Sequence, residues 1–259
     1  MPEVCLVIPC FNEASRLDGR AILSMLARHP ELSVCLVDDG STDGTVGVLE
    51  SLREESPSRV LVHRLPSNQG KAEAVRQGIR HVAASRGPAF VGYWDADFST
   101  PLEELPRLQE VMLAHPDCLM VLGSRVKRLG SQIDRRTVRH VLGRVFSTCA
   151  NAILEIPVYD SQCGAKLFRL AAVEHVFAQP FVTRWCFDLE ILVRLRDTLG
   201  PDQFRAAAIE VPLGHWREVA GSKLGPLQML RIPIALLRIK RHYKAGGSGG
   251  SGPGVIKQS

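Results

Sequence analysis

The sequence predicts an α/β protein with a mostly parallel sheet and helices on both faces. Short apolar runs, such as residues 4–8 and 34–37, alternate with segments whose apolar residues recur at helical spacing, such as residues 20–28. Continuous apolar runs are typical of strands buried on both faces, and helical connections between strands favour parallel neighbours. The 259 residues, 45% of them hydrophobic, are enough to build a substantial core.

The predicted elements follow in a regular order along the first half of the chain. We expect strands at residues 4–8, 34–37, 60–62, 90–94 and 121–123, and helices at 20–28, from the turn at 41–44 through 52, and at 71–84. A further helix begins near Thr137. A C-terminal amphipathic helix carries Leu227, Leu230, Ile234 and Leu237, and Pro233 is expected to kink or divide it. The Gly/Ser-rich stretch near the C-terminus predicts a flexible tail over residues 241–259.

Composition excludes several classes of protein. The formal net charge is +5, which is too small to indicate a nucleic-acid partner. The seven cysteines are scattered singly, which favours reduced, buried thiols and no zinc site. No signal-peptide pattern and no apolar stretch of spanning length is present, so we expect a cytoplasmic protein without a transmembrane helix.

Polar motifs follow the predicted strands at the points where they end. Pro9, Asn12 and Glu13 follow the first strand, Asp38 and Asp39 the second, Lys71 opens the third helix, and Asp95 and Asp97 follow the fourth strand. The carboxyl ends of parallel strands meet at one edge of an open α/β sheet, which is where ligands bind. The sequence therefore predicts a single site built from these motifs.

The pair Asp95 and Asp97 is a candidate metal site. Two carboxylates at a strand end can supply oxygen ligands to a hard divalent cation that also holds a diphosphate. A solvated turn with a helix cap is the simpler alternative for so short a pattern. No G-x-G-x-x-G follows a predicted strand and G-x-x-x-x-G-K-[ST] is absent, which disfavours a dinucleotide fold and a P-loop.

The motifs at residues 8–13, 37–45, 68–71 and 95–97 together resemble the family 2 glycosyltransferases of the GT-A fold. Three later motifs, at 160–168, 184–190 and 216–224, resemble the polyprenyl-phosphate branch of that family. The resemblance implies a Rossmann-like GT-A domain over residues 1–240. Its nucleotide-binding half would be 1–123 and its acceptor-binding half 124–240.

The resemblance also implies roles for individual residues. The nucleotide-sugar would be bound by Pro9, Asn12, Glu13, Asp38, Asp39, Lys71, Asp95 and Lys223, with Lys223 on a loop that closes over the diphosphate. Asp95 and Asp97 would hold Mg²⁺ or Mn²⁺. Asp97, Asp160 and Asp188 are the candidate catalytic carboxylates; Asp160 would orient the acceptor or act as a base. Structural hydrogen bonds remain the alternative for Asp160 and Asp188, and an exposed position remains the alternative for Lys71.

A cluster of arginines indicates the acceptor. Arg125, Arg135, Arg136 and Arg139 lie in a stretch from Gly123 to Ala150 whose only acid is Asp134. A cluster of guanidinium groups with almost no carboxylates beside it suits phosphate, because each guanidinium can donate bidentately to phosphate oxygens. A basic patch near a membrane without specific contacts is the alternative. The basic C-terminal helix similarly predicts either a membrane-surface element or a helix packed on the core.

The expected activity is inverting, metal-dependent transfer of a hexose to polyprenyl phosphate at the cytosolic membrane face. UDP-glucose is the favoured donor and GDP-mannose the next. An ionised phosphate can attack the anomeric carbon without a general base, whereas a hydroxyl acceptor needs one. Two alternatives stay open: transfer to a glycan or protein hydroxyl, and a nucleotide-sugar-binding module without turnover.

Overall fold

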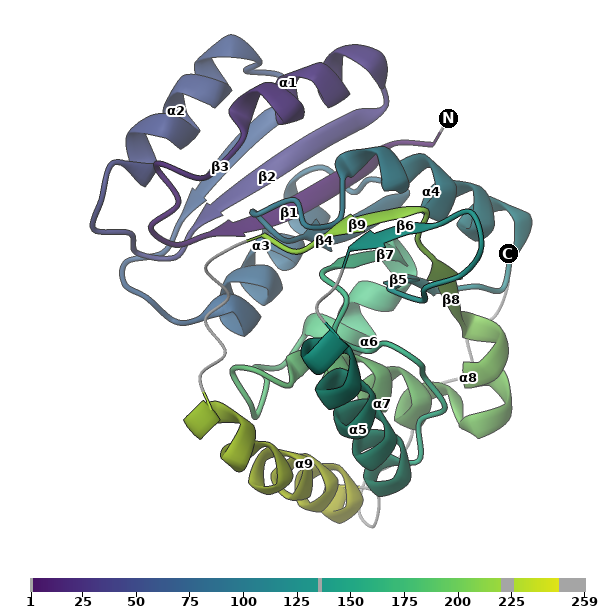
Figure 1. Ribbon diagram of the computed structural model, residues 1–259. Helices are drawn as coiled ribbons and strands as arrows, with labels where there is room; N and C mark the ends of the chain where they lie inside the picture. The colour runs from purple at the N-terminus through teal and green to yellow at the C-terminus, as the bar shows by residue number, and fades with distance from the viewer. Residues whose placement is uncertain (1, 135–136, 220–225, 247–259) are drawn as a thin grey trace.

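The computed structural model describes residues 2–134, 137–219 and 226–246, and is organised around one central sheet (Figure 1). The sheet has seven strands in the order β3-β2-β1-β4-β7-β5-β8. Their bounds are β1 Val4–Cys10, β2 Leu32–Asp38, β3 Val60–Arg64, β4 Phe90–Trp94, β5 Met120–Ser124, β7 Ala165–Arg169 and β8 Ala208–Pro212. Each predicted strand is present and extends at most a few residues beyond its predicted range.

The sheet is mostly parallel, as predicted, with one exception. Strand β7 runs antiparallel to β4 on one side and to β5 on the other. The sequence did not predict this strand, because its five residues include Lys166 and Arg169, which interrupt the apolar pattern. Its insertion between β4 and β5 brings the segment before Ala165 against the loop that follows β4.

Helices cover both faces of the sheet, because successive strand side chains point to opposite sides. Leu6 and Ile8 of β1 pack on one face with α1, α2 and α4, whereas Val7 packs on the other with α3, α6 and α7. The helices are α1 Gly19–Arg28, α2 Thr45–Glu55, α3 Lys71–Ser85, α4 Leu105–Ala114, α5 Thr137–Leu154, α6 Val173–Phe177, α7 Phe187–Leu199, α8 Pro201–Ala207 and α9 Pro226–Gly246, with 3₁₀ turns at Leu102–Glu104 and Leu170–Ala172.

A second, two-stranded sheet lies against the carboxyl edge of the large one. It pairs β6 (Gln132–Asp134) with β9 (His215–Arg217) in parallel. The N–H of Arg217 donates to the carbonyl of Ser99 at 3.0 Å, and that of Gln132 to the carbonyl of Gly214 at 2.7 Å. The first bond attaches β9 to the loop after β4, which carries Asp95 and Asp97, and the second joins β6 to the residue before β9.

The C-terminal helix extends further than predicted. Helix α9 continues to Gly246, whereas the flexible tail was expected over residues 241–259. Pro233, expected to kink or divide the helix, does not divide it. It packs against α5 and α7. Residues 247–259 lie outside the described part of the chain. No helix among the described residues is long and apolar enough to cross a membrane.

The cysteines follow the prediction with one correction. All seven are free thiols and six of them are buried, but Cys149 on α5 is exposed. Burial raises the pKa of the Cys5 and Cys163 thiols to about 11, so neither forms a thiolate at neutral pH.

Candidate active site

The loops after β1 and β2 are bound to each other at the carboxyl edge of the sheet. Asn12 adopts a positive φ of 55°, and its Oδ1 accepts the N–H of Thr42 at 2.9 Å. The N–H of Glu13 donates to Oγ1 of Thr45 at 2.8 Å, and the Glu13 carboxylate pairs with Arg16 at 3.0 Å. The structure thus brings Asn12 and Glu13 beside the β2 loop, and their contact with a nucleotide stays a prediction.

Asp39 organises the loop that precedes α3. Its two carboxylate oxygens accept the N–H groups of Gln69 at 2.7 Å and Gly70 at 2.9 Å. Gly70 has φ +92°, a conformation that other residues rarely adopt. Burial raises the pKa of Asp39, although the two N–H groups partly oppose this effect. Asp38, which is also buried, accepts the N–H of Ser41 at 3.2 Å.

Lys71 and Asp95 form an ion pair at the centre of this edge. The Lys71 ammonium lies 2.5 Å from Oδ1 of Asp95, although the Lys71 side chain is still 37% exposed. Burial lowers the pKa of Lys71, but the carboxylates of Asp95, Asp188 and Asp97 outweigh that effect and leave the pKa raised. Lys71 is therefore a charged group surrounded by three predicted site residues.

Hydrogen bonds hold the Asp97 carboxylate and the Asp95 backbone in place. Oδ1 of Asp97 accepts the N–H of Ser99 at 2.9 Å. The N–H of Asp95 donates to the carbonyl of Gly164 at 3.0 Å, which joins β4 to the start of β7. Gly164 has no room for a side chain, because an added Cβ would lie 2.0 Å from Oδ2 of Asp95.

The Asp95 and Asp97 carboxylates are compatible with a divalent metal ion whose remaining ligands come from a bound diphosphate. Among the described residues no group of three or more His, Cys, Asp or Glu side chains could hold a metal ion by itself. Mg²⁺ is commonly bound by one or two carboxylates together with substrate phosphates, and Asp95 and Asp97 supply two. A cavity of about 840 Å³ opens beside Asp97, with Phe98 and Trp216 among its walls.

Asp188 lies in a buried charged cluster that the sequence did not predict in full. It is 4% exposed and Lys166 is 0% exposed. The Lys166 ammonium donates to Oδ1 of Asp188 and to the carbonyl of Cys163, both at 2.6 Å, and the Tyr93 hydroxyl donates to the same Asp188 oxygen. Lys166 belongs to the motif at residues 160–168 and Asp188 to the motif at 184–190, but no sequence pattern indicated that the two side chains pair.

Glu190, the second acidic residue of the motif at residues 184–190, has a structural role. Glu190 accepts the N–H groups of Val182 and Thr183, each at 2.8 Å, and the Tyr243 hydroxyl of α9 at 3.1 Å. These bonds connect α7 and α9, and they occupy both carboxylate oxygens of Glu190.

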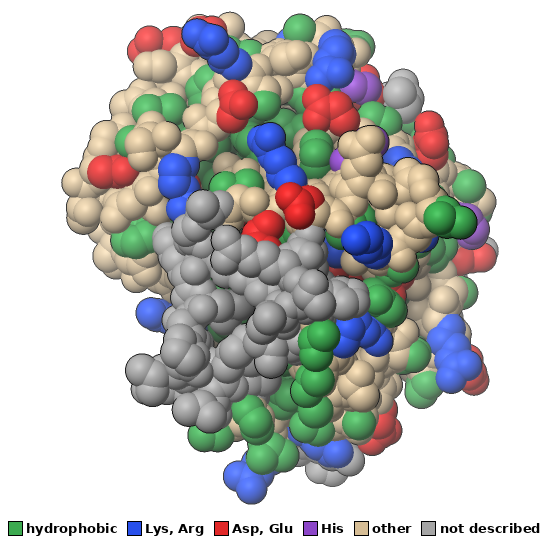
Figure 2. Space-filling model, viewed as in Figure 1, with side chains coloured by type: hydrophobic (Ala, Val, Ile, Leu, Met, Phe, Trp, Pro, Cys, Tyr) green, Lys and Arg blue, Asp and Glu red, His purple; other side chains and the backbone are tan. Residues whose placement is uncertain are grey.

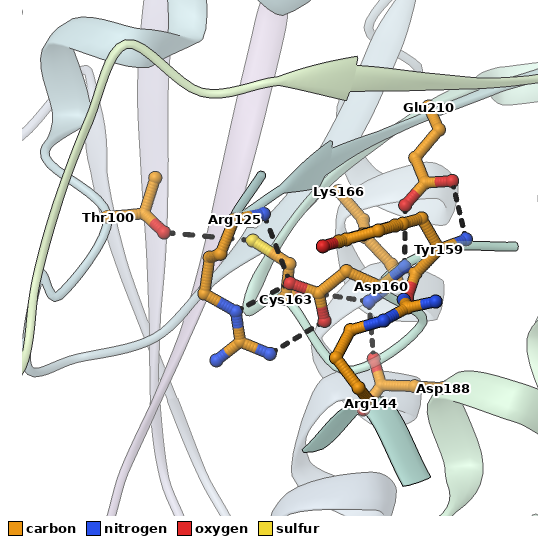
Figure 3. Close-up of polar contacts among 9 residues, drawn as sticks. All are labelled: Thr100, Arg125, Arg144, Tyr159, Asp160, Cys163, Lys166, Asp188 and Glu210. Carbon is orange, nitrogen blue, oxygen red and sulfur yellow. Dashed lines mark hydrogen bonds and ion pairs between the residues drawn. The ribbon is translucent and has the colours of Figure 1, made fainter. Parts of the chain in front are cut away.

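Arg125, at the end of β5, forms a bidentate ion pair with Asp160 (Figure 3). Nε donates to Oδ2 of Asp160 at 2.6 Å and Nη2 donates to Oδ1 at 2.7 Å. Asp160 outweighs the effect of burial and raises the pKa of Arg125, and Asp95 contributes in the same direction. The structure therefore pairs Asp160 with Arg125, and the predicted role of Asp160 towards the acceptor stays a prediction.

Four predicted cations are not placed by the structure. Arg135, Arg136 and Lys223 lie outside the described residues. Arg139 belongs to α5, and its side chain lies outside the described part. Their roles stay predictions. Arg144 of α5 lies in the same arginine-rich stretch but was not among the predicted phosphate contacts, and it donates to the carbonyl of Tyr159 at 2.7 Å.

The Rossmann-like sheet with its inserted antiparallel strand has the GT-A fold. Residues 5–177 match the family model described as glycosyl transferase family 2, and the chain therefore belongs to that family. The resemblance inferred from the sequence motifs is confirmed.

Three similar proteins illustrate the relationship. A dolichyl-phosphate beta-glucosyltransferase from Trichomonas vaginalis is 31% identical over 252 residues, covering 93% of this chain and 71% of the relative. The mannosyl-3-phosphoglycerate synthase of Rubrobacter xylanophilus has a TM-score of 0.64 at 19% identity, over 96% of this chain and 76% of its own. The glucosyl-3-phosphoglycerate synthase of Mycobacterium tuberculosis, solved with Mn²⁺, UDP and glucosyl-3-phosphoglycerate, has a TM-score of 0.60 at 20% identity, over 93% and 80%.

Proposed function

We propose that this glycosyltransferase moves a hexose from a nucleoside diphosphate sugar to a polyprenyl phosphate of the dolichyl type. Glucose from UDP-glucose is the favoured donor, and mannose from GDP-mannose is the next. The observation that carries this proposal is Arg125, a charged guanidinium held at the end of β5 within electrostatic range of Asp95. The name of the Trichomonas vaginalis relative supports the same acceptor and the same sugar.

The partners of the buried carboxylates support an acceptor that arrives ionised. Asp160 is paired with Arg125, and Asp188 is paired with Lys166. A carboxylate that is bound to a cation is a weak base, because proton uptake would break the ion pair. A phosphate monoester has a second pKa of about 6 and needs no base at neutral pH. A single displacement by this phosphate would invert the anomeric carbon.

We further propose that Asp95 and Asp97 hold Mg²⁺ or Mn²⁺ when the donor is bound. The ion would neutralise negative charge on the departing nucleoside diphosphate. Lys71 lies 2.5 Å from Asp95 and supplies a second positive charge at the same place. Asn12, Glu13 and Asp38 would face the base and ribose of the donor.

The proposal is tested by offering matched acceptors to the wild-type protein. UDP-glucose or GDP-mannose is supplied with Mn²⁺ or Mg²⁺ and either a polyprenyl phosphate or the corresponding polyprenol. Labelled lipid should form only with the phosphate, and faster with UDP-glucose. Equal transfer to the polyprenol or to a glycan hydroxyl would favour the hydroxyl-acceptor alternative. Donor binding without any turnover would favour the binding-module alternative.

Replacing Asp97 with asparagine should reduce kcat at least about 100-fold, because a metal ligand contributes several kcal/mol of charge stabilisation. The neutral side chain can still accept the N–H of Ser99, so the loop should keep its shape. Activity is measured against a titration of Mn²⁺ and of Mg²⁺. The exposed Asp117, changed to asparagine, is the matched control and should behave as wild type. Unchanged metal dependence in the Asp97 variant would rule out the ligand role.

We also propose that α5 and α9 together rest on the cytosolic face of a membrane. Val141 and Val145 of α5 and Ile234 and Leu237 of α9 are exposed, and the two helices pack against each other. Neither helix contains an acidic residue. Figure 2 shows apolar side chains with Lys and Arg beside them over the region where these helices lie. An apolar face with cations alone suits an anionic lipid surface.

Changing Ile234 and Leu237 together to serine should weaken binding to anionic vesicles about 100-fold or more, because each aliphatic side chain loses about 1.5 kcal/mol or more of burial in lipid. Binding is measured by vesicle sedimentation. Leu113 of α4, which is exposed elsewhere, is changed to serine as the control and should bind as wild type. Equal losses in the two variants would contradict the proposed face.

A further inference from the structure

Glu210 of β8 holds the chain segment that carries Asp160. Its Oε1 accepts the N–H of Asp160 at 2.6 Å and its Oε2 accepts the N–H of Tyr159 at 2.8 Å (Figure 3). The segment between α5 and β7 contains no helix or strand of its own. A carboxylate can accept from two successive N–H groups with its two oxygens, whereas a neutral amide has only one acceptor atom. The charge of Glu210 is therefore needed to fix both peptide groups.

Asp160 transmits this placement to Arg125. One edge of the planar guanidinium, formed by Nε and Nη2, is bound by the two oxygens of Asp160, and Oδ2 also accepts the backbone N–H of Arg125 at 3.1 Å. The side chains of Arg125 and Asp160 are 15% and 8% exposed. Because a guanidinium has five N–H donors in one plane, the edge that includes Nη1 points away from Asp160. That edge can still donate bidentately to a phosphate.

Two aromatic contacts limit movement of this assembly. The ring of Trp216, a residue of β9, lies 5.4 Å from Cζ of Arg125. On the other side, Arg144 of α5 lies 3.7 Å from the Tyr159 ring centre and donates to the Tyr159 carbonyl at 2.7 Å. Arg125 is thus held along one edge by Asp160, and its guanidinium lies over the Trp216 ring.

We infer that Glu210 is a positioning residue for acceptor binding: through Asp160 it orients Arg125 so that one guanidinium edge is presented to the acceptor phosphate. This inference rests on the proposed transfer to a polyprenyl phosphate. A preoriented guanidinium loses little rotational freedom when the phosphate binds, so affinity for the acceptor is gained without new contacts. Glu210 itself does not touch the phosphate.

The test is a double-mutant cycle on acceptor kinetics with Glu210→Gln, Arg125→Lys and the two combined. Glu210→Gln should raise KM for polyprenyl phosphate about tenfold and leave KM for the nucleotide-sugar unchanged. Lysine lacks the paired Nε and Nη2 donors that Asp160 binds in Arg125. Glu210→Gln should therefore have little further effect in the Arg125→Lys background. Glu110→Gln, at an exposed position of α4, is the control and should match wild type.

Each outcome separates the inference from the function on which it rests. Absence of transfer to polyprenyl phosphate by the wild type would overturn the proposed function itself. Transfer by the wild type with additive effects in the cycle, or with an equal rise in the donor KM, would overturn the role of Glu210 alone. If Glu210→Gln does not fold, the cycle is run with Glu210→Asp. That variant keeps the charge on a shorter stem, and its effect should likewise disappear in the Arg125→Lys background; additivity there would also overturn the inference.

Discussion

Replacing Gly164 with alanine should lower kcat/KM for sugar transfer by about 100-fold or more, the effect expected when a catalytic group is displaced by about 1 Å. The new Cβ would lie 2.0 Å from Oδ2 and 2.2 Å from Cγ of Asp95. The Gly164 backbone cannot simply move away, because its carbonyl accepts the N–H of Asp95 and its neighbour Ala165 begins β7. The Asp95 carboxylate must therefore turn out of its position beside Lys71.

The steady-state kinetics and the melting temperature of this variant are measured together. Gly47→Ala on α2 is the matched control, since nothing lies within 4 Å of its added Cβ. Alanine is also a better helix former than glycine, so this control should be active and slightly more stable. Activity of Gly164→Ala within a few-fold of wild type would contradict the assigned position of Asp95. A folded but inactive variant would support it.

Replacing Lys166 with methionine should destabilise the protein by about 3–5 kcal/mol, as expected when one partner of a buried ion pair is removed. Lys166 has no exposed surface, and it donates to Asp188 and to the Cys163 carbonyl at 2.6 Å. Methionine fills a similar volume but leaves Asp188 buried with the Tyr93 hydroxyl as a neutral partner. The free energy of unfolding is measured by urea denaturation.

Two further variants distinguish the buried charge from a general packing effect. Lys166→Met combined with Asp188→Asn removes both charges and should recover part of the lost stability. Lys127→Met, at an exposed position, should change stability by less than about 0.5 kcal/mol. A loss below about 1 kcal/mol for Lys166→Met would show that the pair contributes little.

Local sequence patterns predicted the parallel strands β1 to β5, but not β8, which pairs in parallel with β5. The runs around Leu6, Leu36 and Val91 are apolar on both faces, and the intervening helices carry their apolar residues at helical spacing. Strand β7 was not predicted, because a lysine and an arginine break its apolar pattern. Only its position between β4 and β5 makes it a central strand. Periodicity reports burial of a segment, but it does not report which strands will be neighbours.

The site shows the same division between local and long-range information. The sequence by itself determined that Asn12, Asp39, Lys71 and Asp95 meet at one edge, because each follows a parallel strand or opens the next helix. Only the tertiary structure decided the pairings, which join Arg125 to Asp160, Lys166 to Asp188 and Glu210 to the Tyr159 peptide. The physical reason is that ion pairs and hydrogen bonds depend on distances in space, and those distances are set by strand order and by segments that have no periodic pattern.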